Sequence, residues 1–431
     1  MRLAQSIPYR LGDELSLLAA VEGRPAVFAL FFSDNVDGGV PYLSRTRDLR
    51  RRLARLLNES SGTSKRLNLR AITHRIEFQY VGSTFEAQWL LYLLNRKFYP
   101  RLYRQRLRLK PPALLKINLR NRFPRCYPTR RLAHDGSLYY GPFPSRASAE
   151  RFAGEFLDLF KIRRCVETLH PDPSHPGCIY SQMKMCLAPC FAGCADDEYQ
   201  RELGRVVSFL DAAGQPLIES LRDERDRASG ALDFESAERA HRKIEKVNEV
   251  LRSRPVLVSN LGRLNALIVL PGVAPRTVAF FRLAGCELRG PAMLLLDENV
   301  PQPEPLDQQL DRLAASLAPA ASPSACGIQS PDAVRRYEES ASSFSHAGAP
   351  PSSRHSDPTV AGEESALPRR PRSQAASASW EHLALVSRWY YSSHREGDLM
   401  MLTPGGALPH RQLIRLCRKL VEGDSTPHPC S

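Results

Sequence analysis

The sequence lacks several features that would assign it to a special class. Its 431 residues contain no apolar run of the roughly 18 residues that a membrane-spanning helix needs. Gly and Pro number 25 and 34, too few for a collagen-like chain or one without folded cores. The first residues show no apolar segment followed by a small-residue cleavage site, so we expect no signal peptide and a cytoplasmic location. Thiols stay reduced there, and the ten cysteines therefore need an explanation other than disulfides.

Acidic residues are scarce in one stretch of the chain. Between Pro41 and Leu132 there are 23 Lys and Arg residues but only 4 acids, an excess of 19 positive charges. The whole chain carries a formal charge of +14, so the remainder is mildly acidic. A basic region beside an acidic remainder indicates a polyanionic partner, most simply a nucleic acid. The alternative is a solubility surface, but such surfaces usually mix both signs.

The apolar pattern of the first hundred residues predicts a small mixed domain. Ala26–Phe32 and Val40–Leu43 flank a turn-like segment and are typical of a β-hairpin. Leucines at helical spacing among arginines over Arg47–Asn58 predict a helix with one buried and one cationic face. Ile76–Val81 is a candidate third strand, and Thr84–Phe98 is an apolar helix that ends before a proline.

The rest of the chain alternates between folded segments and a segment of low complexity. We expect a strand at Leu114–Leu119, a helix at Ala147–Phe160, a charged helical pair at about 197–212 and 216–252, and β-like alternation over 262–298. Residues 317–379 are rich in Ala, Ser and Pro, which bury too little apolar surface to offset the entropy of ordering, so we expect a disordered linker. Trp380–Val421 is interpreted as a small cap on the strands of 262–298, or as a DNA contact through arginines and aromatics.

Four cysteines fall within 26 residues. Cys165, Cys178, Cys186 and Cys190 are separated by 12, 7 and 3 residues, with prolines and glycines that favour turns between them. Four thiolates at this spacing can surround one compact metal centre, an iron–sulfur cluster or a structural zinc. Zinc sites usually show two close cysteine pairs, so the uneven spacing favours iron–sulfur. The plain alternative is a set of unliganded buried cysteines.

These features occur in an order that resembles one known family. The order is the hairpin, the arginine-rich helix, the apolar helix ending in Tyr99-Pro100, then Phe123-Pro124-Arg125, Tyr140-Gly141-Pro142-Phe143 and Cys186-Leu187-Ala188-Pro189-Cys190. It is similar to UvrC, the incision subunit of bacterial nucleotide excision repair, and to its shorter Cho-like relatives, from about residue 23 to 252. The resemblance implies an N-terminal GIY-YIG nuclease domain, double-stranded DNA as partner, and a helical hairpin that binds a UvrB-like protein. It also implies that Cys165, Cys178, Cys186 and Cys190 hold a [4Fe–4S] cluster.

The resemblance also places the nuclease residues one by one. Tyr42 matches the second tyrosine of the hairpin, Arg45 the lysine that follows it, and Arg52 the arginine of the next helix. Such residues help to activate water and neutralise the phosphate while one divalent metal stabilises charge. Phe28 stands where the family has its first tyrosine, and Leu91 where it has the metal-binding glutamate. Without that carboxylate we expect no Mg²⁺ site, and hence a domain that grips phosphate with impaired nuclease chemistry.

Further positions near this site leave an alternative open. Tyr103 stands where the family has an asparagine. The replacement carboxylates that the sequence offers are Glu77, on the neighbouring strand, and Glu86, which five helical residues turn about 140° from Leu91. A substitute ligand would make the chain an active, divergent Cho-like endonuclease. The plain alternative for the retained residues is a tyrosine packed in the hairpin and two solvated arginines.

The helical segment after the cysteines also resembles the family. Asp233–Arg239 is similar to the core of the UvrB-binding motif, but His241-Arg242 stands where the family has Arg-Asp. The partner-binding candidates are Phe234, Glu235, Ala237 and Ile244. The alternative is an ordinary amphipathic helix pair that packs on its own domain.

The predicted fold class is α+β and multidomain, with a small α/β domain of GIY-YIG type, a cysteine cluster, an α-helical hairpin and a C-terminal mixed α/β region interrupted by the linker. The expected divisions are 1–105 for the GIY-YIG-like domain, 106–200 for a basic linker region and the cysteine cluster, 201–255 for the hairpin, 256–316 for a β-rich region, 317–379 for the disordered linker and 380–431 for the C-terminal cap. We find no counterpart of the second, RNase H-like nuclease of full-length UvrC, because the acids after residue 300 lie in low-complexity sequence.

These observations favour a UvrC-like DNA-binding protein of nucleotide excision repair with impaired nuclease chemistry. Two alternatives stay open. One is the active Cho-like endonuclease that incises damaged DNA. The other is a non-repair nucleic-acid-binding scaffold that keeps a metal cluster for stability.

Overall fold

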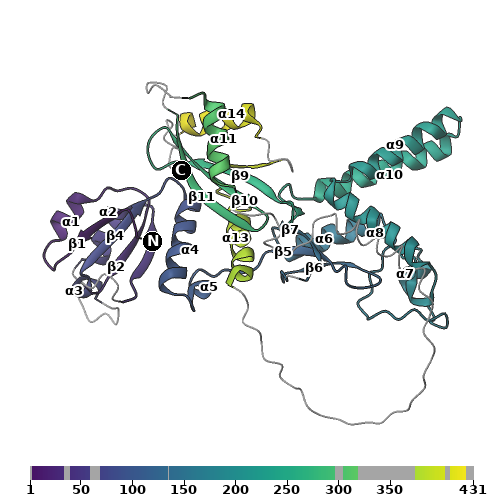
Figure 1. The fold of residues 1–431 in the computed structure, drawn as a ribbon, viewed down its shortest axis with the longest axis horizontal. Helices are drawn as coiled ribbons and strands as arrows, with labels where there is room; N and C mark the ends of the chain where they lie inside the picture. Colours follow the sequence, from purple (N-terminus) through teal and green to yellow (C-terminus); the bar gives the residue numbers. More distant parts are fainter. Residues whose placement is uncertain are drawn as a thin grey trace, which may run out of the picture.

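A computed structural model of the chain describes residues 2–33, 39–58, 68–133, 135–296, 304–318, 374–402 and 408–423. Within these residues the strands form three four-stranded antiparallel sheets, each covered by helices (Figure 1). This arrangement confirms the predicted α+β, multidomain fold class. None of the described helices is both long and apolar enough to cross a membrane.

The N-terminal sheet has the order β1-β4-β2-β3 and contains the expected hairpin, because β2 pairs antiparallel with β3. Its elements are β1 (Gln5–Pro8), α1 (Glu14–Ala20), β2 (Ala26–Phe31), β3 (Tyr42–Thr46), α2 (Leu49–Leu56), α3 (Leu69–Ile72), β4 (Arg75–Tyr80), α4 (Thr84–Phe98) and α5 (Tyr103–Arg106). Strand β2 is buried along its whole length, since α1 and α2 pack on one face of the sheet and α4 packs on the other. Strand β1 has no counterpart among the expected elements, because four residues without apolar alternation carry no strand signal.

The middle sheet has the order β6-β5-β7-β8 and shares its hydrophobic core with residues of four helices. Its elements are β5 (Ala113–Ile117), β6 (Cys126–Thr129), β7 (Leu138–Phe143), α6 (Arg146–Leu157), α7 (Ile179–Gln182), the 3₁₀ turn η1 (Pro189–Phe191), α8 (Asp196–Asp211) and β8 (Ser259–Asn260). The Tyr-Gly-Pro-Phe segment lies on β7. A Cβ on Gly141 would lie 2.5 Å from Leu114 Cδ2, so only glycine lets β7 pack this closely on β5.

A helical hairpin follows, and it corrects one expectation. The segment at 216–252 is two antiparallel helices, α9 (Gln215–Gly230) and α10 (Phe234–Ser253), which project away from the sheets in Figure 1. The chain reverses after Gly230, and the Asp233 carboxylate caps α10 by accepting a hydrogen bond from the Ser236 N–H, 3.0 Å away. Helical periodicity on both sides of this short turn conceals the break.

The third sheet joins residues that are far apart in the sequence. β9 (Asn265–Pro271), β10 (Thr277–Ala284) and β11 (Glu287–Leu295) form the expected strands, and β12 (Asp398–Met401) completes the sheet by pairing with β9. The helices of this part are α11 (Leu306–Ser316), α13 (Gln374–Tyr390) and α14 (His410–Gly423). Helix α14 packs on β9 and β10, so the C-terminal residues cover these strands. Nearly all of the expected linker lies outside the described residues.

Helix α13 touches all three parts of the molecule, since it packs on β11, β7 and α4. Its Glu381 is fully buried and accepts hydrogen bonds from Tyr92 Oη at 2.8 Å, Tyr103 Oη at 2.7 Å and Arg104 Nε at 2.6 Å. A buried carboxylate is tolerated only when it is paired and hydrogen-bonded in this way. The Glu381 cluster therefore fixes α13 against α4 and α5.

Candidate functional site

The structure brings together two of the three retained nuclease positions. Arg52 on α2 donates from Nη2 to Tyr42 Oη on β3 over 3.4 Å. The Tyr42 ring lies 6.2 Å from the ring of Phe28, which is fully buried between the sheet and α2. A hydroxyl at position 28 would have to find a partner inside this apolar cluster. Phe28, at the first tyrosine position, therefore contributes to packing, while Tyr42, at the second, lies beside the guanidinium of Arg52.

The third retained residue, Arg45, lies elsewhere. Residues three apart on a strand point to opposite faces, so Arg45 lies on the α4 side of the sheet and Tyr42 on the α2 side. Arg45 lines a separate cavity of about 420 Å³ with Gly82, Ala87 and Glu396. The expectation that Tyr42, Arg45 and Arg52 form one phosphate site is met only for the first and the last.

The position of the metal-binding glutamate is filled by an apolar contact. Leu91 is half-buried and packs on the cluster of Val27, Ala29 and Leu43 between the sheet and α4. This side chain offers no oxygen to a cation.

The two replacement carboxylates already have partners. Glu77 lies 3.3 Å from Arg75 in an ion pair. Glu86 Oε2 accepts a hydrogen bond from the Gly82 N–H over 2.9 Å, while Oε1 is buried without a partner. Burial raises the pKa of Glu86 above its usual value, since the charged form is poorly solvated there. Neither carboxylate is bonded to Tyr42 or Arg52, so these two described residues do not fit the divalent-metal site that the family resemblance implies.

Tyr103, which stands at the asparagine position, also has a structural partner. Its hydroxyl donates to Glu381 on α13 over 2.7 Å. The residue is committed to the contact between α5 and α13 rather than to the Tyr42–Arg52 pair.

The four cysteines share one loop region after α6. Cys178 precedes α7, Cys190 lies in η1, and the Ala188 N–H donates to Cys186 Sγ over 3.3 Å. Burial and, to a smaller degree, the neighbouring thiols of Cys165, Cys178 and Cys190 raise the pKa of the Cys186 thiol to about 11. No disulfide links the described cysteines. The thiols are therefore reduced neighbours, and a bound cation would relieve the cost of ionising them together.

A buried arginine holds the start of this loop, and sequence reasoning missed it. Arg163 is 4% exposed and donates to Phe123 O at 2.8 Å, Glu167 O at 2.8 Å and Cys165 Sγ at 3.6 Å. Tyr199 on α8 accepts from the Arg163 N–H at 2.9 Å and donates to Pro124 O at 2.8 Å. These bonds explain the Phe-Pro-Arg motif, whose backbone anchors the cysteine loop.

The cysteines do not form a finished single-ion site. In the part of the chain that the structure describes, no three His, Cys, Asp or Glu side chains converge closely enough to hold a metal ion. The thiols lie close enough to raise one another's pKa, but they do not converge on a single point.

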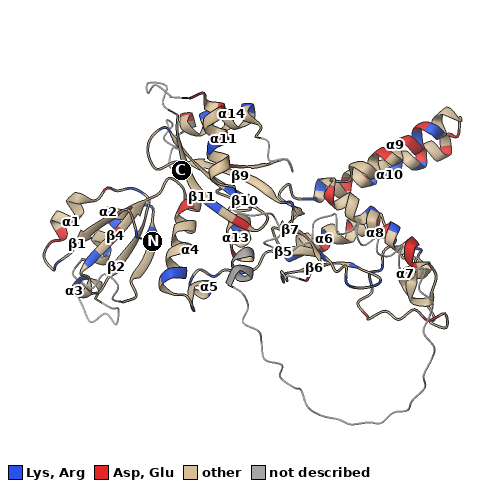
Figure 2. Ribbon diagram, viewed as in Figure 1, with Lys and Arg blue, Asp and Glu red and all other residues tan. Residues whose placement is uncertain are grey.

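The hairpin exposes only some of the partner-binding candidates. Phe234 is 68% exposed at the start of α10, beside Leu232 at 73%, and charged residues of both signs follow along both helices (Figure 2). Glu235 is exposed and Ala237 is half-buried. Ile244 is buried in the core below the sheet, so the expectation that it faces a partner is wrong. The exposed apolar surface is confined to the tip.

Comparison with known proteins identifies the middle of the chain. Residues 113–209 match the family model of the UvrC/Cho excinuclease middle domain. The chain is 27% identical over 337 residues to UvrABC system protein C of Serratia proteamaculans, covering 70% of this chain and 54% of that protein. It is 30% identical over 273 residues to the protein of the same name from Mannheimia succiniciproducens, covering 63% and 44%. No solved structure matches.

The hairpin, the arginine-rich helix and the apolar helix that ends in Tyr99-Pro100 precede the region that the family model matches. The chain spans about half the length of the curated relatives it matches. The Phe-Pro-Arg, Tyr-Gly-Pro-Phe and cysteine segments all fall inside the middle-domain match. On this evidence residues 113–209 correspond to the UvrC/Cho excinuclease middle domain, and the chain as a whole is similar to UvrABC system protein C.

Proposed function

We propose that the chain is a DNA-binding protein of nucleotide excision repair, of the UvrC type, with impaired nuclease chemistry in its N-terminal domain. Two observations carry the proposal: the Tyr42–Arg52 pair is retained on the α2 face of the sheet, and Leu91, at the family's glutamate position, is an apolar side chain that packs on the α4 face. A guanidinium beside a tyrosine hydroxyl can neutralise and orient a phosphodiester. Cleavage would also need charge stabilisation by a divalent metal, and of the described carboxylates neither Glu77 nor Glu86 is bonded to this pair.

We further propose that Cys165, Cys178, Cys186 and Cys190 bind a [4Fe–4S] cluster, with zinc as the alternative. The thiols share one loop, the Ala188 N–H points at Cys186 Sγ, and Arg163 contacts Cys165 Sγ. Hydrogen bonds to cluster sulfurs of this kind tune and stabilise iron–sulfur centres. When bound, the cluster would cross-link a loop that has little regular structure of its own.

The tip of the hairpin is the proposed contact with a UvrB-like protein. Phe234 and Leu232 are large apolar side chains that no part of the described chain covers, at the end of a helical pair that extends beyond the sheets. An exposed aromatic anchor at a projecting tip is typical of a protein–protein contact.

The test is recruitment to a lesion. A lesion-bearing duplex is incubated with UvrA and UvrB, and retention of the chain is compared with retention on undamaged duplex. We expect UvrB-dependent retention that Phe234→Ala lowers about tenfold, since a central aromatic anchor is worth about 1.4 kcal/mol or more. Leu15→Ala is the matched control, because Leu15 is an 85% exposed leucine on α1.

The outcomes separate the repair protein from a non-repair scaffold. Equal retention with and without UvrB, unchanged by Phe234→Ala, would show nucleic-acid binding without a repair partner. Retention that depends on UvrB and on Phe234 supports the proposal.

A further inference from the structure

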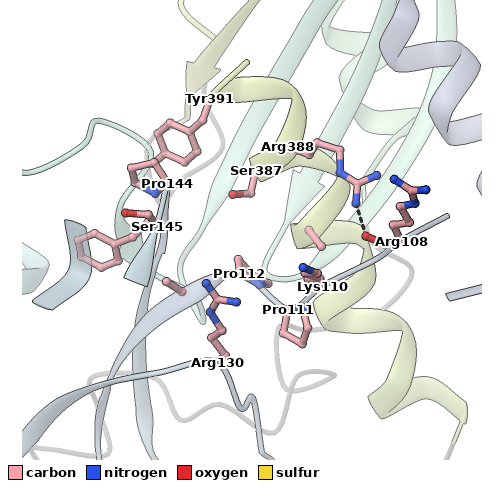
Figure 3. Close-up of a pocket in the computed structure, with 13 residues that line it drawn as sticks. Arg108, Lys110, Pro111, Pro112, Arg130, Pro144, Ser145, Ser387, Arg388 and Tyr391 are labelled. Atoms are coloured by element: carbon pink, nitrogen blue, oxygen red, sulfur yellow. Dashed lines mark hydrogen bonds between the residues drawn. The ribbon is translucent and has the colours of Figure 1, made fainter. Parts of the chain in front are cut away.

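A cavity of about 360 Å³ lies where the middle sheet meets α13 (Figure 3). Four cations line it: Arg108 and Lys110 before β5, Arg130 after β6, and Arg388 on α13. Ser145 and Ser387 add two hydroxyls. No acidic residue of the described chain is part of the lining.

The positive charge of this cavity is not neutralised by ion pairs with the described residues. In the described residues none of the four cations forms a salt bridge. Arg388 instead donates to the backbone oxygens of Leu107 at 3.2 Å and Arg108 at 2.7 Å, which orients its guanidinium without cancelling its charge (Figure 3). Such a cavity favours an anion.

The cavity is open to ligands larger than a simple ion. The side chains of Arg108, Lys110, Arg130 and Arg388 are all exposed, so the charged wall can be reached from outside. Three of these four belong to the strongly basic stretch between Pro41 and Leu132. Guanidinium, ammonium and hydroxyl donors around one opening match the oxygens of a phosphate.

We propose that this cavity binds a backbone phosphate of a nucleic acid strand. The inference rests on the proposed DNA-binding function but concerns a different place from the Tyr42–Arg52 pair. The strand would contact the N-terminal domain and the junction of the middle sheet with α13, and the phosphate contacts would add to the affinity without reading sequence.

The cavity forms only when α13 is docked. Tyr391 on α13 donates to Pro142 O of β7 over 2.8 Å, and Arg388 bonds to the segment before β5. The wall thus combines residues separated by more than 250 positions. Phosphate binding would therefore stabilise the docked position of α13.

The test compares the salt dependence of duplex binding in the full chain. Lys110→Ala/Arg130→Ala removes two exposed cations without touching the bonds that hold α13. Neutralising one duplex phosphate contributes about 0.9 to the slope of log K against log salt. We expect the double variant to reduce the slope by about one and the affinity five- to tenfold at roughly 0.1 M salt.

Two further variants control the experiment. Arg201→Ala removes an exposed cation on α8, away from the cavity, and should leave the slope unchanged. Lys110→Arg/Arg130→Lys keeps both charges and should restore most of the slope, which a mere folding defect would not do. A melting temperature for each variant shows that the fold is retained.

The outcomes overturn or support the site independently of the repair function. An unchanged slope in the double variant overturns the proposal, even if UvrB-dependent recruitment persists. Micromolar binding of inorganic phosphate or deoxyadenosine monophosphate, lost in the double variant while duplex binding is unchanged, also overturns it in favour of a small free anion. A reduced slope supports the site, even if recruitment by UvrB fails.

Discussion

In the N-terminal region, apolar side chains occupy positions where the family pattern has polar ones, whereas in the middle region buried polar side chains hydrogen-bond to the backbone of the Phe-Pro-Arg motif. Phe28 and Leu91 pack into the two apolar clusters on either face of the first sheet. Arg163 and Tyr199, by contrast, bond to the Phe-Pro-Arg backbone and to the cysteine loop. The comparison teaches that Phe28 and Leu91 contribute apolar packing to the N-terminal region, whereas Arg163 and Tyr199 contribute buried hydrogen bonds to the middle region.

The largest effect is expected in the cysteine loop. Cys186→Ser should abolish the bound metal, measured as visible absorbance and iron content after anaerobic purification, and lower stability by several kcal/mol, because metal binding is coupled to folding. Cys194→Ser is the matched control, since Cys194 lies near the loop but outside the four proposed ligands. Equal metal content in Cys186→Ser and wild type would contradict the proposal that Cys186 is a metal ligand.

The next effect concerns the arginine beneath that loop. Arg163→Ala leaves the Phe123 and Glu167 carbonyls without their donor and should cost about 3 kcal/mol of unfolding free energy in urea titrations. Arg201→Ala, an exposed arginine in a surface ion pair, should change stability by less than about 0.5 kcal/mol. Similar losses in both variants would show that the buried network does not stabilise the middle region.

In the N-terminal region, adding a buried polar group, rather than removing one, should destabilise the protein. Phe28→Tyr returns the family hydroxyl to a fully buried position and should destabilise the protein by about 1–2 kcal/mol. Tyr42→Phe, which removes a hydroxyl at the half-buried neighbouring position, should cost less than about 1 kcal/mol. If Phe28→Tyr stabilised the protein instead, the tyrosine hydroxyl would have a hydrogen-bond partner at position 28.

The smallest effect tests the replacement carboxylate. Burial raises the pKa of Glu86, so the folded state favours its protonated form and stability is lost as pH rises from the ordinary glutamate range through the folded pKa. Glu86→Gln should therefore match wild type near pH 4 and be more stable by about 1 kcal/mol at neutral pH. Millimolar Mg²⁺ should leave this difference unchanged. Mg²⁺ that stabilised wild type selectively would identify Glu86 as a metal ligand.

Much of the N-terminal region could be predicted because its signals are local. Leucines at helical spacing predicted α2, and two apolar runs around a turn predicted the β2–β3 hairpin. The α9–α10 break carried a readable signal too, because Gly230 and the capping Asp233 flank it. The helical spacing of apolar residues continues on both sides of this turn, so that spacing alone predicts one unbroken helix.

The candidate sites were less accessible to sequence reasoning because they depend on long-range contacts. Arg388 donates a hydrogen bond to the backbone oxygen of Arg108, 280 positions earlier in the chain, and no local sequence pattern predicts that contact. Arg45 and Arg52 look equivalent in an arginine-rich segment, yet strand alternation sends Arg45 to the other face of the sheet. Only the assembled fold distinguishes them.

The most direct measurement of the central claim is incision itself. A lesion-bearing duplex is incubated with UvrA, UvrB and either wild type or Arg52→Ala, with Mg²⁺ or Mn²⁺, and nicked strands are counted. We predict binding by both proteins, weaker for Arg52→Ala, and no metal-dependent nicking by either. Metal-dependent nicking by wild type that Arg52→Ala abolishes would contradict the claim and show that another residue holds the metal.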